Sequence, residues 1–148
     1  MVPPRLYADL AYLWPLLSPP EDAAAEAELM RTILTDRLGV GDRRLQVLEL
    51  GAGAGHALVH LRDLVDAVAV DLSEAMLAHC RAVNPEVPAI LGDMRTVTAP
   101  GAGAFDAVLI HDSIDYMLSE ADVRATFANA HRHLRRGGLL LASPTYVL

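Results

Sequence analysis

Three glycines alternate with alanines in the segment 51–55, which follows the apolar run 46–50 and precedes a helical pattern. Glycine allows positive φ angles and lets the backbone lie directly against a ligand. Free N–H groups at the start of a helix favour an anionic or carboxylate group. The spacing is G-x-G-x-G, whereas dinucleotide-binding folds have G-x-G-x-x-G. A tight turn without a ligand is the alternative, but the position after the first strand of a sheet favours a binding site.

Asp71 ends the next apolar run and lies 22 residues after Glu49. In open α/β sheets, ligands bind at the carboxyl ends of the strands, and an acidic residue about 20 residues beyond the glycine motif hydrogen-bonds the ribose hydroxyls. An isolated aspartate at a strand end is more often a helix cap or a solvated turn residue. Together with the glycine turn, Asp71 predicts a ribose-binding carboxylate.

Two later strand ends carry further polar groups. Asp93 and Met94 follow the third apolar run, where the carboxylate can accept from an exocyclic amine and the thioether can lie on an aromatic ring. His111 and Asp112 end the fourth apolar run. A capped turn and a buried structural histidine are the alternative interpretations of these two segments.

Short apolar runs alternate with longer helical patterns along the chain. Strands are expected over residues 46–51, 67–72, 87–93, 105–112 and 139–143, and helices over 5–14, 21–38, 56–65, 73–83 and 119–136. The apolar runs are continuous, as expected for parallel strands that helices cover on both faces. Repeated β–α–β units with right-handed crossovers predict a doubly wound, mostly parallel α/β sheet.

The ordered set of motifs resembles the S-adenosylmethionine-dependent methyltransferases with the class I, Rossmann-like fold. The matching segments are VLELGAGAGH, VDLSEAML, LGDMRTV, FDAVLIHDSIDYML and LRRGGLLLASP. The segments NPEVPAILGDMRTV and SIDYM look similar to the subgroup that methylates amino groups, including deoxysugar N-methyltransferases. The resemblance implies S-adenosylmethionine as the cofactor and a small-molecule amine or hydroxyl as the methyl acceptor.

The resemblance also implies a role for each matching residue. It places Glu49 and the backbone of Gly51, Ala52 and Gly53 at the methionine end of the cofactor. Asp71 would bind the ribose, and His111 would lie near the sulfonium. The adenine would contact Leu72, Asp93 and Met94. An aromatic N-terminal helix often covers the cofactor in this family, so Tyr7 and Tyr12 are candidates for that cover. Candidates for a catalytic base are His111, Asp112 and Tyr116.

The family's strand order is 3-2-1-4-5, and its sheet continues past the fifth strand with a helix and an antiparallel pair. This chain stops at Leu148, just after the fifth expected strand. We expect one domain over 1–148, with an N-terminal helical cap over 1–40 and a cofactor-binding core over 44–144. The last strand would be an apolar, unpaired edge that favours a homodimer. A fragment of a longer chain and a shortened binding module without catalysis are the alternatives.

Composition excludes several classes of function. The net charge is −7, with 12 arginines and no lysine, which argues against nucleic-acid binding and against lysine chemistry. A nicotinamide-dependent oxidoreductase is a rival on the same type of sheet, but the glycine spacing disfavours it. The single cysteine, the lack of a signal-peptide pattern and the lack of a membrane-length apolar run predict a cytoplasmic protein. The 24 alanines and the absence of lysine suggest a high-GC, bacterial genome. His56 and His60 share a helix face, but nothing converges with them, so no metal site is expected.

Overall fold

Five strands form a single sheet in the order β3-β2-β1-β4-β5, and every neighbouring pair is parallel. The computed structural model describes residues 4–145, so the ends of the expected domain, 1–3 and 146–148, lie outside the described residues. The strands are β1 (Leu45–Leu50), β2 (Val65–Asp71), β3 (Ala89–Leu91), β4 (Phe105–His111) and β5 (Leu134–Ser143). The expected doubly wound fold and its strand order are confirmed.

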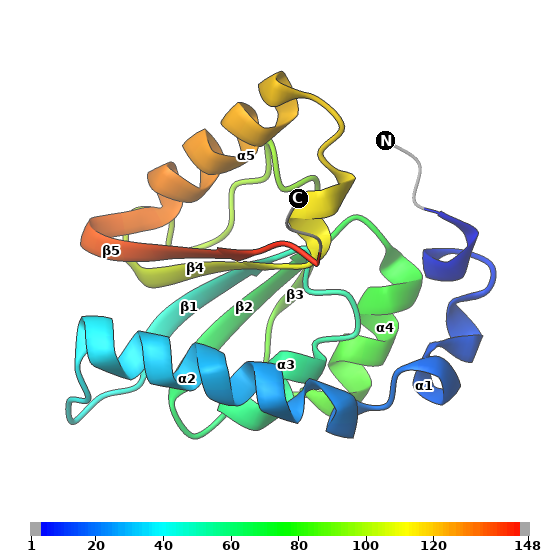
Figure 1. Cartoon of the computed structure of the whole chain (residues 1–148), viewed down its shortest axis with the longest axis horizontal. Coiled ribbons are helices and arrows are strands. Elements are labelled where there is room, and N and C mark those ends of the chain that lie inside the picture. Colours follow the sequence, from blue (N-terminus) through cyan, green and yellow to red (C-terminus); the bar gives the residue numbers. More distant parts are fainter. Residues whose placement is uncertain (1–3, 146–148) are drawn as a thin grey trace.

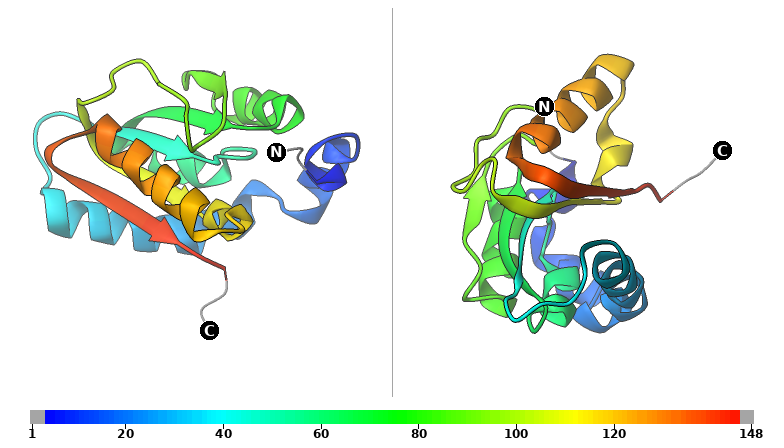
Figure 2. Two further views of the ribbon diagram at one scale, coloured as in Figure 1. Left: turned by 90° about the horizontal axis from the view of Figure 1, so that it is seen from above. Right: turned by 90° about the vertical axis from the view of Figure 1, so that its left-hand side faces the viewer.

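Helices cover both faces of this sheet (Figure 1). On one face lie α2 (Ala24–Leu38), α3 (His56–Leu61) and α4 (Glu74–Val83), and on the other lies α5 (Glu120–His133). The N-terminal segment extends beyond α2 towards α4, as the view from above in Figure 2 shows. No helix among residues 4–145 has both the length and the apolar character that a membrane span requires.

Alternate residues of the central strands enter two separate hydrophobic clusters. In β4, Ala107 and Leu109 pack with α2 and α3, whereas Val108 and Ile110 pack on the opposite face, where α5 lies. All four side chains are fully buried. The continuous apolar runs in the sequence therefore follow from burial on both faces of the sheet.

The N-terminal segment differs from the expected helix over 5–14. It forms three-ten turns at η1 (Arg5–Tyr7) and η2 (Ala11–Leu13), followed by the single turn α1 (Trp14–Leu17) and by η3 (Pro20–Ala23). These turns pack individually on the domain, because Ala11 is buried against Ala54 and Met76. Proline in the first turn of α1 and of η3 fixes where each begins.

Two helix ends also differ from the expectation. Helix α3 stops at Leu61, because Val65 already pairs with Leu45 in the sheet. Helix α5 stops at His133, and the following residues join β5 instead of continuing the helix to residue 136. Gly137, with φ of 77°, lies where the pairing of β5 with β4 shifts register. Gly137 and the next residue, Gly138, thus form an irregularity inside β5 and do not end the helix.

An ion cluster holds together the edge of the sheet where β4 begins. The Asp106 side chain is fully buried and accepts hydrogen bonds from Arg43 (2.6 Å), Arg135 (2.6 Å) and the backbone N–H of Gln46 (2.8 Å). The Arg43 guanidinium holds the pKa of this carboxyl well below its usual range, and Arg135 adds to the effect. The first residues of β1, β4 and β5 are thereby tied to one carboxylate.

Candidate active site

The carboxyl ends of the strands surround a cavity of about 420 Å³, within the range of small-molecule and cofactor sites. All the predicted site residues except Tyr12 line it, as do several residues that the sequence reasoning missed. The additional lining residues include Trp14, Asp22, Glu26, Met76 and Ser113. The glycine turn and the acids at positions 71 and 93 therefore lie around one space, as predicted.

The glycine turn closes tightly at the end of β1. Gly51, Gly53 and Gly55 all have positive φ angles, of 75°, 55° and 69°. A Cβ atom at Gly51 would lie 2.3 Å from the Ser113 side chain, so only glycine fits there. The N–H groups of Gly51 and Ala52 both donate to the carbonyl of Val70, which fixes the turn against β2.

Asp71 lies at the end of β2 and is held by two backbone donors. Its carboxylate accepts from the N–H of Gly53 at 2.8 Å and from the N–H of Ser73 at 2.8 Å. Burial raises the pKa of this carboxyl, and the two backbone hydrogen bonds oppose that shift. The side chain is therefore fixed in one orientation, with its remaining lone pairs available to a ligand in the cavity.

Glu49 is a buried carboxyl whose Oε2 atom has no hydrogen-bond partner among the described residues. Burial, helped by the nearby charge of Asp71, raises its pKa to about 8. An unpartnered buried carboxylate is costly, so the protein without a ligand keeps Glu49 protonated at neutral pH. A cationic group in the cavity would supply the missing partner and favour the charged form.

Asp93 and Met94 are fixed by contacts that the sequence did not reveal. Arg95 binds both carboxylate oxygens of Asp93, at 3.0 and 2.6 Å, and also binds Asp122 at 2.6 Å. The Arg95 guanidinium lowers the pKa of Asp93. The Asn129 side chain donates to the carbonyl of Met94, so helix α5 fixes this loop.

Aromatic side chains from the N-terminal segment and from η4 (Ser113–Tyr116) cover one part of the cavity. The Tyr7 ring lies 5.4 Å from the Trp14 ring and 5.8 Å from the Tyr116 ring, and the two tyrosine hydroxyls are 2.7 Å apart. Burial and the bond to Tyr7 raise the pKa of Tyr116. Tyr12 does not line the cavity and is 68% exposed, because the turn η2 replaces the expected helix there.

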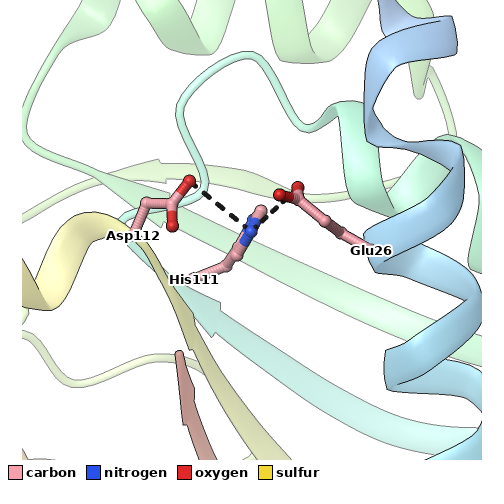
Figure 3. Close-up of side chains that lie close together, drawn as sticks. All are labelled: Glu26, His111 and Asp112. Carbon is pink, nitrogen blue, oxygen red and sulfur yellow. Dashed lines mark ion pairs between the residues drawn. The ribbon is translucent and has the colours of Figure 1, made fainter. Parts of the chain in front are cut away.

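His111 and Asp112 end β4 and meet Glu26 from the first turn of α2 (Figure 3). The Nε2 atom of His111 lies 3.0 Å from Glu26 Oε2 and 3.5 Å from Asp112 Oδ2. Elsewhere, His56 lines the cavity, whereas the Nε2 atom of His60 lies 2.8 Å from the carbonyl of Pro20.

The cavity wall has a strongly acidic character. Six acidic residues line it, and among residues 4–145 no arginine does. The six are Asp22, Glu26, Glu49, Asp71, Asp93 and Asp112. Such a wall favours a cationic ligand and disfavours a phosphate-bearing one.

A family model described as a methyltransferase domain matches residues 47–138. The chain belongs to the methyltransferase domain family. The resemblance on which the sequence reasoning relied is thereby confirmed. The match extends from β1 to the middle of β5, so it includes the glycine turn and four of the six acids that line the cavity, but not Asp22 or Glu26.

Three relatives illustrate what this methyltransferase domain is similar to. It is 29% identical over 126 residues to the dTDP-3-amino-3,4,6-trideoxy-alpha-D-glucopyranose N,N-dimethyltransferase of Streptomyces venezuelae. This match covers 84% of this chain and 51% of that protein. The structure of the sugar N-methyltransferase KedS8 from a Streptoalloteichus species has a TM-score of 0.78 at 30% identity, covering 94% of this chain and 56% of that one. SAM-bound CalS10, an amino pentose methyltransferase from Micromonospora echinaspora, has a TM-score of 0.74 at 27% identity, covering 84% and 51%. The chain spans about half the length of these relatives.

Proposed function

We propose that this chain binds S-adenosylmethionine and transfers its methyl group to a small-molecule amine or hydroxyl. The observation that carries the proposal is the convergence of the glycine turn, Asp71 and the unpartnered Glu49 carboxyl around one acidic cavity. An amine acceptor is favoured, because the relatives include enzymes named for N-methylation of sugars. The acidic wall also suits an acceptor that arrives as an ammonium ion.

The residues present fit this cofactor at several points. Glu49 would take the positive ammonium of the methionine portion, which is the partner that its buried oxygen lacks. The backbone of Gly51, Ala52 and Gly53 would lie against the same portion. Asp71 would accept from the ribose hydroxyls. The adenine would lie among the side chains of Leu72, Asp93 and Met94, which line the cavity.

The remaining wall would bind the acceptor. When bound, the cofactor supplies an electrophilic methyl group on a sulfonium. The protein aligns the acceptor and excludes water, and a protonated amine has to lose its proton before it can attack. His111 or Asp112 would accept that proton. Tyr116 is better suited to donate a hydrogen bond, since burial raises its pKa, and Tyr7 would cover the site beside it.

Three narrower statements belong to the same proposal. A homodimer would form through the exposed edge of β5, which is the last strand of the sheet. A cytoplasmic location suits the only cysteine, Cys80, which is buried and unpaired. A bacterial origin suits the relatives, which come from bacteria such as Streptomyces and Bacillus.

Calorimetric titration with S-adenosylhomocysteine, beside NAD⁺, tests the proposal. We expect saturable binding of the first ligand only. Asp71→Asn should weaken it by about 2 kcal/mol, or about 30-fold, because two charge-assisted hydrogen bonds become neutral ones. Asp66→Asn, on the exposed side of the same strand, is the matched control.

Saturable binding of NAD⁺ alone, or equal affinities for the wild type and Asp71→Asn, would refute the assignment. Transfer of a labelled methyl group to a panel of amino sugars and hydroxyl compounds then tests catalysis. Binding without transfer to any of them would support a binding module in place of an enzyme.

A further inference from the structure

Figure 3 shows three metal-ligating side chains close together, and all three line the cavity. Glu26 comes from α2, and His111 and Asp112 come from the end of β4, 85 and 86 residues further along the chain. One ligand atom from each residue lies within 4.8 Å of the other two. His111 and Asp112 were expected at the site, but Glu26 was not, because only the packing of α2 beside the sheet brings it to them.

Hydrogen bonding within the cluster leaves part of it unsatisfied. A single ring nitrogen, Nε2 of His111, faces both carboxylates, at 3.0 and 3.5 Å. One N–H can satisfy Glu26, but the separation from Asp112 exceeds that of a well-formed hydrogen bond. Both carboxylates are about half exposed, and either a protonated imidazole or a bound cation would balance their charge.

The spacing distinguishes between two kinds of cation. Ligand atoms about 2.1 Å from a metal ion, at angles of about 90–109°, lie about 3.0–3.4 Å apart. Acceptors placed tetrahedrally about 2.8 Å from an ammonium nitrogen would lie about 4.6 Å apart. The separations of 3.0 and 3.5 Å are compatible with ligands of one metal ion and are too short for acceptors around one ammonium, although 3.0 Å is also the length of an ordinary imidazole–carboxylate hydrogen bond.

We propose that Glu26, His111 and Asp112 bind a divalent cation that accepts imidazole and carboxylate ligands, such as Zn²⁺ or Mn²⁺. Three protein ligands leave coordination positions open towards the cavity, where an acceptor oxygen or a water can bind. The two carboxylates balance the charge of the ion, so the site adds no net positive charge beside a sulfonium. The role of His111 as a base then applies only to the protein without the ion, because the metal takes the lone pair of Nε2.

The ion site goes beyond the proposed methyl transfer and is tested with the metal alone. Mn²⁺ is titrated into the purified chain, and the loss of the free-ion signal is followed by electron paramagnetic resonance, with Zn²⁺ as a competitor. We expect one bound Mn²⁺ per chain, displaced by Zn²⁺. Glu26→Gln and Asp112→Asn should each weaken binding by more than about 10-fold, since even outer partners of a metal site cost about 10–100-fold.

Matched variants keep the experiment interpretable. Asparagine tolerates the positive φ of 56° at position 112, so Asp112→Asn retains the backbone. Glu28→Gln is the control, because Glu28 lies on α2 outside the cavity lining and pairs with Arg31. Circular dichroism and S-adenosylhomocysteine titration of each variant report folding and cofactor binding separately from the ion.

The proposal is overturned if the wild type binds no Mn²⁺ at millimolar concentration, or if both ligand variants bind it as tightly as the wild type. Binding of methylammonium at this wall without binding of Mn²⁺ would also overturn it and would assign the cluster to an ammonium group. Titration with S-adenosylhomocysteine is a separate measurement, so its outcome neither supports nor overturns the ion site.

Discussion

Replacing Glu49 by glutamine tests the electrostatics of the cavity most directly. The pKa of this carboxyl is about 8 in the folded chain, against an ordinary value of 4.5. Between these two pH values the folded chain keeps a proton that the unfolded chain has released. The free energy of unfolding of the wild type should therefore fall as the pH rises through this window, and it should level off above the folded pKa.

The size of this effect follows from the difference in pKa. The difference of about 3.5 units corresponds to about 5 kcal/mol, at about 1.4 kcal/mol per unit. Glutamine has a similar shape and does not titrate, so Glu49→Gln should gain up to that amount relative to the wild type at pH 8.5 and little at pH 5. Glu86→Gln, which changes an exposed residue, is the control for general charge effects.

Urea unfolding of the three proteins at several pH values between 5 and 8.5 measures this difference. Parallel pH profiles for the wild type and Glu49→Gln would refute the reasoning. Calorimetry adds a second readout, because S-adenosylhomocysteine binding to the wild type at pH 7 should release a proton from Glu49. Glu49→Gln should be more stable, bind the ligand more weakly and release no such proton.

Two further predictions concern the glycine turn and the ion cluster around Asp106. Gly51→Ala should lower the free energy of unfolding by about 3 kcal/mol, because the position has a positive φ and the new methyl group would overlap Ser113. Gly53→Ala should lower it by only about 1–2 kcal/mol, because only the positive φ opposes the change. Equal losses for the two variants in urea unfolding would contradict the crowding at Gly51. Asp106→Asn should cost about 2 kcal/mol or more at pH 7, because charged hydrogen bonds are lost. Since the folded pKa of Asp106 is depressed, the wild type should lose this advantage as the pH falls below about 4, and thermal melts of both proteins at pH 7 and pH 3 check it.

The sheet and about half of the cavity lining could be predicted from the sequence. Strand runs that are buried on both faces are continuously apolar, and the carboxyl ends of parallel strands lie at one edge. These two facts together place Glu49, Asp71, Asp93 and His111 around one space. The separate ends of the strands did not have to be located accurately for this inference to hold.

Contacts between distant segments could not be predicted in this way. Glu26 and Trp14 enter the cavity only because the N-terminal segment packs across the domain, and Arg95 gains its role from Asp122 on α5. Tyr12 illustrates the converse, since its orientation depends on how each short turn packs rather than on helical periodicity. Tertiary packing determines whether such side chains reach the cavity, and the local sequence pattern does not reveal that packing.

The strand β4 joins two regions with opposite energetic character. Near its start, Asp106 binds two guanidinium groups, and at its end His111 and the following Asp112 reach a cavity wall lined by six acidic residues and, among residues 4–145, by no arginine. The stabilising Asp106 cluster and the cavity therefore lie at opposite ends of the same strand. Substitutions that change the cavity wall therefore leave the Asp106 cluster at the other end of β4 intact.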